Sequence, residues 1–196
     1  MPYPLIYLSR HGQTDWNAED RFQGGRDIPL NDTGREQARG NGIALRGLVG
    51  SGEGFEFVAS PLSRARETME IVRREMGIDP TTYRTDDRLR EVCYGDWEGQ
   101  TYPELEARGG DPWERRERDK WNFNPGGPGA ESYADLTARV KAWLDEVRGP
   151  SVIVAHGGVI RSLFRLIGER TEEQAAHEPT PQDRVLRIEG DAIGWV

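Results

Sequence analysis

The chain has 196 residues, a net charge of −8 and a single cysteine, so an intrachain disulfide scaffold is excluded. No run approaches the roughly 20 apolar residues of a membrane helix, the first residues lack the pattern of a secretory signal, and the negative charge argues against non-specific nucleic-acid binding. We therefore expect one cytoplasmic domain over residues 1–196, with neither a nucleic acid nor a membrane as partner.

Short apolar strands alternate with amphipathic helices along the chain. Residues 5–8, 57–59 and 151–155 are apolar runs typical of buried strands. The apolar spacing predicts helices over residues 33–49, 61–76, 136–147 and 159–167. Thr33 with Glu36, and Thr171 with Gln174, have the spacing of capping boxes that open helices. Residues 184–196 are expected to form a hairpin that turns at residues 189–191.

This alternation predicts an α/β fold, a three-layer α/β/α sandwich with a mostly parallel central sheet. Residues 99–129 depart from the pattern, because they are rich in tryptophan, arginine and glycine. We interpret this segment as a short cap inserted over the carboxyl ends of the strands, where ligands bind in such sheets. A solvated helix followed by a surface loop is the other interpretation of the same residues.

Histidine and arginine side chains follow three of the predicted strands. Arg10 and His11 end the first strand, Arg64 follows the second, and His156 follows the strand at residues 151–155. Guanidinium groups match the oxygens of a phosphate group, and a neutral imidazole can attack phosphorus. Glycines after each histidine, Gly157 among them, allow the backbone to approach an anion. Each residue alone is more often an ordinary loop residue, but four together favour a phosphoryl-transfer site.

A metal site is the competing functional interpretation of these histidines. The chain contains three histidines in all, and neither an HxxxH pattern nor a pair of cysteines occurs. We therefore expect no metal and no other cofactor.

The motifs around these residues resemble the signature of the histidine phosphatase (phosphoglycerate mutase-like) superfamily. They run in order over most of the chain: residues 10–17, 21–24, 27–31, Gly34 with 37–38, 60–68, 89–91, 95–99, Gly129 with 131–133, and 155–161. The resemblance implies that His11 is a nucleophile that becomes phosphohistidine and that Arg10, Arg64 and His156 clamp the phosphoryl oxygens.

The resemblance also implies roles for residues that the spacing alone does not identify. Glu91 would give a proton to the leaving oxygen and then activate water, whereas the residues alone leave Glu91, Glu98, Glu67 and Asp96 as equal candidates. The family pattern further indicates substrate contacts, which we expect at Asn17, Gln23, Gly24 and Tyr94.

We predict a metal-independent phosphomonoester phosphatase that acts on a small phosphorylated metabolite through phosphohistidine. A phosphoglycerate mutase, which would return the phosphoryl group to its substrate, is the alternative. The short cap and the end of the chain directly after the last expected strand favour access of water, and hence the phosphatase. A protein phosphohistidine phosphatase and a non-catalytic phospho-ligand binder are weaker alternatives. The substrate and the oligomeric state stay open.

Overall fold

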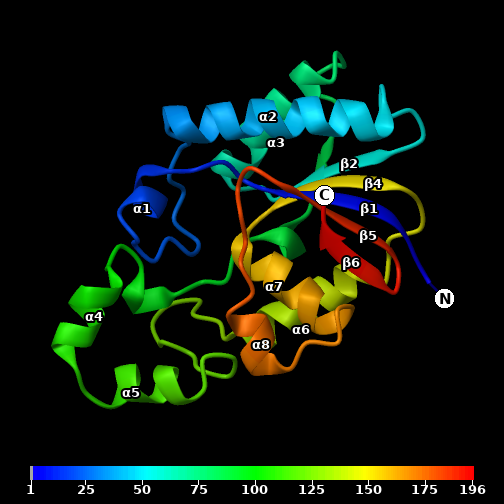
Figure 1. Ribbon diagram of the computed structural model, residues 1–196. Helices are drawn as coiled ribbons and strands as arrows, with labels where there is room; N and C mark the ends of the chain where they lie inside the picture. The colour runs from blue at the N-terminus through cyan, green and yellow to red at the C-terminus, as the bar shows by residue number, and fades with distance from the viewer. Residues whose placement is uncertain (1) are drawn as a thin grey trace.

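A six-stranded sheet runs through the computed structural model, which describes residues 2–196 (Figure 1). The strands are β1 (Tyr3–Arg10), β2 (Glu56–Ala59), β3 (Arg84–Thr85), β4 (Ser151–Ala155), β5 (Val185–Gly190) and β6 (Ala192–Trp195). Their order is β3-β2-β4-β1-β5-β6. The first four strands in this order are parallel, β5 is antiparallel to β1, and β6 is antiparallel to β5. The mostly parallel sheet and the terminal hairpin predicted from the sequence are confirmed.

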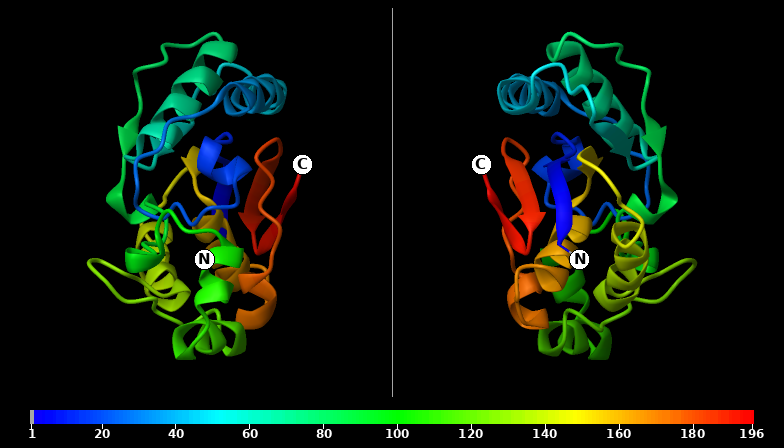
Figure 2. Two further views of the ribbon diagram at one scale, coloured as in Figure 1. Left: turned by 90° about the vertical axis from the view of Figure 1, so that its left-hand side faces the viewer. Right: turned by 90° about the vertical axis from the view of Figure 1, so that its right-hand side faces the viewer.

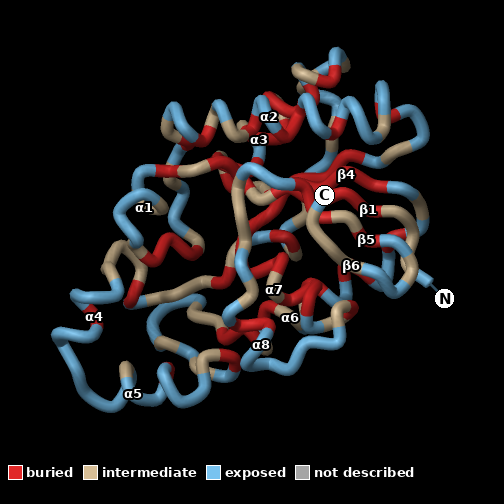
Figure 3. Tube along the Cα trace, viewed as in Figure 1, coloured by how far each residue is buried: buried red, intermediate tan, exposed pale blue. Residues whose placement is uncertain are grey.

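Helices cover both faces of the sheet because side chains alternate along its strands (Figure 2). Tyr7 packs with helices α2 (Asp32–Val49) and α3 (Ser63–Glu75), whereas Ile6 and Leu8 pack on the other face. That second face is covered by α6 (Tyr133–Leu144) and α7 (Gly157–Leu166). Burial is therefore concentrated in the strands and in the inner sides of these helices (Figure 3). The predicted three layers are confirmed.

Residues 99–129, the cap segment, form helices α4 (Tyr102–Arg108) and α5 (Asp111–Arg118) and the loop that follows them. The two helices lie beyond the carboxyl end of β1 (Figure 1). They are held there by an aromatic cluster in which Phe22 and Trp97 are buried and Trp113 and Phe123 pack against them. Phe22 follows β1, so the cap segment is attached to the same end of the sheet as the predicted site.

The helix starts show where local patterns succeed and where they fail. Thr171 and Gln174 form the predicted capping box of α8 (Glu172–Ala176). The capping box predicted at Thr33 is wrong, because α2 begins at Asp32 and Asn31 caps it by accepting a hydrogen bond from the Gly34 amide. Asparagine is as good an N-cap as threonine, and the threonine falls inside the first turn.

Short elements escaped prediction. Strand β3 has two residues, helix α1 (Asp15–Ala18) has four, and two 3₁₀ turns cover Asp87–Leu89 and Gly95–Trp97. None is long enough to show a periodic pattern.

In the described part of the chain, no helix has the length and apolar character needed to cross a membrane.

Candidate active site

Three neighbouring parallel strands bring the predicted residues together. The pairing of β1 with β4 places Arg10 opposite Ala155, and the His11 amide donates a hydrogen bond of 2.9 Å to the Ala155 carbonyl. The rings of His11 and His156 consequently lie with their centroids 5.0 Å apart. Strand β2 lies on the other side of β4 and leads through Ser60 to Arg64 in the first turn of α3. Strand order therefore explains why residues far apart in the chain converge.

The tautomer of His11 is set by the backbone carbonyl of the next residue, Gly12. Its Nδ1 lies 2.7 Å from the Gly12 carbonyl oxygen, and since a carbonyl only accepts, Nδ1 carries the proton. Its Nε2 accepts a hydrogen bond of 3.3 Å from Nε of Arg64. Burial, followed by the charges of Arg64 and Arg10, holds the pKa of His11 well below its ordinary value of 6.5. At neutral pH, His11 is an uncharged imidazole with a lone pair on Nε2.

Arg64 is a buried cation held by backbone carbonyls. Its side chain is fully buried, and it donates to the carbonyls of Arg26 at 2.6 Å and Gly24 at 2.9 Å. Burial lowers the pKa of Arg64 from 12.5 to about 10, so the guanidinium stays charged at neutral pH. A buried charge held by neutral carbonyls provides a positive field for an anion.

Arg10 and His156 each have a buried nitrogen atom without a hydrogen-bond partner in the described part of the chain. Arg10 donates from one terminal nitrogen to the Thr180 carbonyl at 2.9 Å, but its buried Nε has no partner among residues 2–196. His156 Nε2 lies 2.7 Å from the Ser60 hydroxyl, and its buried Nδ1 is likewise without a partner in that part of the chain. Burial is the largest cause that lowers the pKa of both side chains. Buried polar atoms without partners are costly, so they indicate a ligand that satisfies them.

Glu91 lies at the first turn of α7. Its Oε1 accepts hydrogen bonds from the amides of Gly158 at 3.0 Å and Val92 at 2.9 Å. A Cβ atom on residue 158 would meet that oxygen at 2.3 Å, so only glycine allows this approach. Among the four carboxylates that the residues left as candidates, Glu91 is the one that lines the cavity beside His11.

Asn17 is oriented by two hydrogen-bond donors that both contact its side-chain oxygen. Its Oδ1 accepts from the Thr14 amide at 3.2 Å and from Nε2 of Gln182 at 3.2 Å. Both contacts require oxygen rather than nitrogen at this position, which leaves Nδ2 as the group with free hydrogens. Gln182 also donates to the His11 carbonyl at 3.0 Å, so one side chain holds both residues.

A cavity of about 290 Å³ joins these groups. All the predicted site residues except His156 line it: Arg10, His11, Asn17, Gln23, Gly24, Arg64, Glu91, Tyr94 and Gly157. His156 is completely buried and packs against the ring of His11 instead. The Tyr94 hydroxyl lies 3.1 Å from that of Tyr133, and burial raises the pKa of Tyr94 well above 10.

Other residues line the cavity that the sequence did not put forward as site residues. They are Asp20, Arg21, Phe22, Tyr102, Arg161 and Gln182. Arg161 carried a usable signal, because it lies four residues after Gly157 and hence on the same face of α7. Gln182 carried only a weak signal, its position before the last expected strand, because its contacts join residues 165 and 171 positions apart.

The arrangement suits an anion held by nitrogen donors. Four arginines (Arg10, Arg21, Arg64 and Arg161) and His11, with its unprotonated imidazole nitrogen, line one small cavity, and the amide end of α7 lies at its edge. Across residues 2–196, no group of three or more histidine, cysteine or carboxylate side chains is placed to hold a metal ion. The expectation of a metal-independent reaction stays a prediction.

Comparisons with known proteins agree with this geometry. The family model described as histidine phosphatase superfamily (branch 1) matches residues 6–196. A 2,3-bisphosphoglycerate-dependent phosphoglycerate mutase of Methylobacterium radiotolerans is 35% identical over 178 residues, which cover 87% of this chain and 82% of that protein. A glucosyl-3-phosphoglycerate phosphatase of Mycobacterium tuberculosis is 34% identical over 174 residues, covering 81% and 72%.

Solved structures share the fold over nearly the whole chain. Bacillus stearothermophilus YhfR superposes with a TM-score of 0.76 at 28% identity, covering 98% of this chain and 95% of the other. A phosphoglycerate mutase of Thermus thermophilus superposes with a TM-score of 0.69 at 29% identity, covering 94% and 92%. The match of sequence, fold and family model over almost every residue leads to one conclusion: the chain belongs to the histidine phosphatase superfamily, branch 1.

Proposed function

We propose that this protein is a metal-independent phosphomonoester phosphatase that transfers a phosphoryl group from a small metabolite to His11 and then to water. The observation that carries the proposal is the state of His11: a neutral imidazole whose Nε2 bears a lone pair, close to the positive charges of Arg64 and Arg10. Family membership supports phosphatase-type or mutase-type chemistry on phosphorylated small molecules.

In the first half-reaction, Nε2 of His11 attacks phosphorus as the bond from phosphorus to the leaving oxygen breaks. Glu91 gives its proton to that oxygen, so the product leaves as an alcohol rather than an alkoxide. The imidazole acquires positive charge as the new phosphorus–nitrogen bond forms. The Gly12 carbonyl, which already accepts from Nδ1 at 2.7 Å, stabilises that charge.

In the second half-reaction, water attacks phosphorus and the phosphorus–nitrogen bond breaks. The Glu91 carboxylate takes a proton from this water, and the electron pair of the broken bond returns to Nε2. Inorganic phosphate leaves, and both His11 and Glu91 are back in their starting states. One carboxyl group thus serves as acid and then as base.

The remaining residues would bind the phosphoryl group and the substrate. Arg64 and the unpartnered Nε of Arg10 would donate to phosphoryl oxygens. We assign the Ser60 hydroxyl as the donor to Nε2 of His156, so that His156 would carry its proton on Nδ1 and would donate from there. Asn17 would donate from Nδ2, and we assign substrate contacts to its neighbours along the cavity: Gln23, Gly24, Tyr94 and Gly157.

A phosphoglycerate mutase is the second candidate, because relatives of that name reach 35% identity over most of the chain. In a mutase, phosphohistidine would return its phosphoryl group to a second hydroxyl of the bound substrate rather than to water. The phosphatase is supported by the relative of that activity, which matches at 34% identity. A cytoplasmic location stays a prediction.

The experiment measures phosphate release from an aryl phosphate and a panel of phosphomonoesters with a chelator present, for the native protein and His11→Ala. We expect release that survives chelation and is lost in His11→Ala, while thermal unfolding shows that the variant is folded. Release that continues in His11→Ala overturns the proposal. Isomerisation of phosphoglycerate far faster than release would establish the mutase instead, and uptake of label from a phosphorylated protein would favour a protein phosphohistidine phosphatase.

A further inference from the structure

Arg139 holds the stretch of backbone that carries Glu91. It lies on α6, and its Nη1 donates to the carbonyls of Arg88 at 2.8 Å and Arg90 at 2.7 Å. Its Nη2 donates to the carbonyl of Glu91 itself at 3.0 Å. One guanidinium group thus contacts the main chain of Glu91 and of two residues that precede it.

Glu131 holds the chain that follows Glu91. Nε and Nη2 of Arg139 each donate to one oxygen of the Glu131 carboxylate at 2.8 Å. The same carboxylate accepts from the Cys93 amide at 3.2 Å, and the Glu131 amide donates to the Cys93 carbonyl at 2.9 Å. The side chains of Arg139 and Glu131 are 21% and 24% exposed, so the pair is largely shielded from water. Together they fix the backbone on both sides of Glu91.

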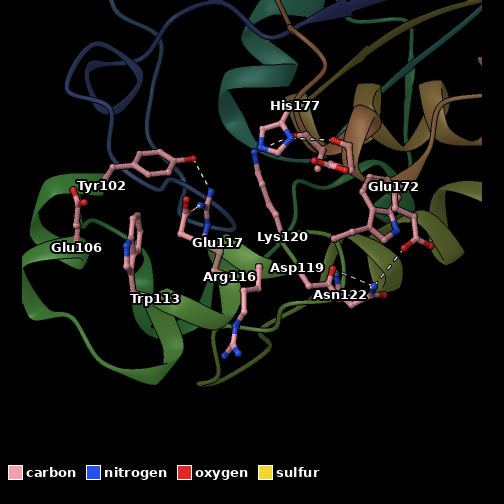
Figure 4. A pocket seen from close by; sticks show the side chains of 14 residues that line it. Tyr102, Glu106, Trp113, Arg116, Glu117, Asp119, Lys120, Asn122, Glu172 and His177 are labelled. Atoms are coloured by element: carbon pink, nitrogen blue, oxygen red, sulfur yellow. Dashed lines mark hydrogen bonds and ion pairs between the residues drawn. The ribbon is translucent and has the colours of Figure 1, made fainter.

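Every N–H donor of Arg139 has an acceptor. A guanidinium group has five N–H bonds, and here they meet three carbonyls and both oxygens of one carboxylate. Arg116 differs in the cavity between the cap segment and α8 (Figure 4), because it pairs with Glu117 at 2.6 Å and donates to the Tyr102 hydroxyl at 2.9 Å. The donors of a lysine radiate from one atom, so lysine could not reach all the acceptors of Arg139.

Residues 90–94 depend on such contacts because they belong to no helix or strand. They lie between the 3₁₀ turns Asp87–Leu89 and Gly95–Trp97, so no regular ladder of hydrogen bonds fixes their backbone. The carboxyl end of Glu91 is held by the Gly158 amide at 3.0 Å. A catalytic group misplaced by about 1 Å can lose about 100-fold in rate, so the backbone end must be held as well.

We propose that Arg139 and Glu131 are positioning residues for Glu91, holding its main chain so that its carboxyl group reaches the leaving oxygen. Across residues 2–196, the lining of the active-site cavity includes neither side chain, so their influence passes through Glu91. The inference rests on the proposed phosphatase function, in which Glu91 gives a proton to that oxygen. Disturbing Arg139 should therefore impair proton transfer more than binding of the phosphoryl group.

The test compares two esters of similar size that differ in their need for this proton. The p-nitrophenolate ion is a stable leaving group, whereas benzyl phosphate must release an alkoxide unless its oxygen is protonated. Arg139→Lys keeps the positive charge and loses the fork of donors. We expect kcat/KM for benzyl phosphate to fall by about tenfold or more and that for p-nitrophenyl phosphate by about threefold or less. Equal losses on both esters would show a general structural role and overturn the inference, as would no loss on either.

A second variant and a matched control accompany Arg139→Lys. Glu131→Gln keeps one acceptor oxygen and should show the same selective loss to a smaller degree, and it decides the question if thermal unfolding shows that Arg139→Lys does not fold. Arg35→Lys is the control, since Arg35 pairs with Glu67 at 2.8 Å between α2 and α3 and is also partly exposed. It should change neither ester, and a selective loss in this control would contradict the inference.

A double variant tests whether the effect passes through Glu91. Because kcat/KM covers the steps up to release of the leaving group, the later attack of water does not enter it. Glu91→Gln should lower kcat/KM mainly for benzyl phosphate, and adding Arg139→Lys should lower it no further, whereas losses that multiply would contradict the inference. Failure of the proposed function looks different: phosphate release is then absent or independent of His11, or Glu91→Gln lowers both esters equally, and the inference fails with it.

Discussion

Replacing Gln182 by leucine tests how the nucleophile and Asn17 are held. The Gln182 amide donates to the His11 carbonyl at 3.0 Å and to Oδ1 of Asn17 at 3.2 Å. Leucine has a similar volume and no donor, so both acceptors lose a partner. Oδ1 of Asn17 still accepts a hydrogen bond from the Thr14 amide, so the substitution should disturb the position of Asn17 less than that of His11.

The expected cost follows from these two bonds. A hydrogen bond lost from a partly buried site costs about 0.5 to 1.5 kcal/mol, so two give about 1 to 3 kcal/mol in the transition state. That free energy corresponds to a loss in kcat/KM of about 5- to 150-fold. Gln182→Glu should lose more, because a carboxylate would face two acceptors and force the Asn17 amide to turn its oxygen toward the phosphate.

The assay is aryl phosphate hydrolysis in a double-mutant cycle with Asn17→Ala. Because Gln182 acts partly through Asn17, the double variant should lose less than the product of the two single losses. Asp183→Ala, at the exposed neighbouring position, is the control and should keep full activity. Strictly multiplicative losses, or a Gln182→Glu variant more active than Gln182→Leu, would refute the reasoning.

Three further predictions follow from the same geometry. Gly158→Ala should lower kcat/KM by about tenfold to a hundredfold, because a Cβ would meet the Glu91 oxygen at 2.3 Å and displace it, whereas Gly40→Ala, with open space around it, should leave kinetics unchanged. Burial lowers the pKa values of His11 and His156, so below pH 6.5 the unfolded chain takes up protons that the folded chain does not. The free energy of unfolding should therefore decrease as the pH is lowered. Urea unfolding should show a loss of about 2 kcal/mol between pH 7 and 5.5, and an unchanged free energy would contradict the buried neutral histidines. Chelator should leave phosphate release unaltered, and loss of activity that added metal restores would refute a metal-independent reaction.

The sequence located most of the site because strand ends are local features. His11 and His156 end apolar runs that became neighbouring parallel strands, so their convergence followed from the strand order. Glu91 was different: it follows a short 3₁₀ turn, and the residues alone left four carboxylates equivalent. The family resemblance pointed to Glu91, and the folded chain places this residue in the cavity and against the Gly158 amide.

Contacts between distant segments explain what the sequence left out. Gln182 reaches His11 across 171 positions, and Lys120 reaches Ala176 across 56, and both pairings depend on how the cap segment and the loop after α8 lie over the sheet. The wrong capping box at Thr33 has a local cause, since Asn31 offers an equivalent side-chain acceptor two residues earlier. Tertiary packing and competing caps, rather than weak apolar patterns, account for these differences.

The most direct test of the account is to trap the phosphorylated enzyme. The native protein is mixed with a radiolabelled phosphomonoester and quenched within milliseconds, and the label is mapped to its residue. The account predicts an acid-labile phosphoryl group on His11, absent from His11→Ala. Label on another residue, or full turnover with no phosphorylated His11 at any time, would contradict it.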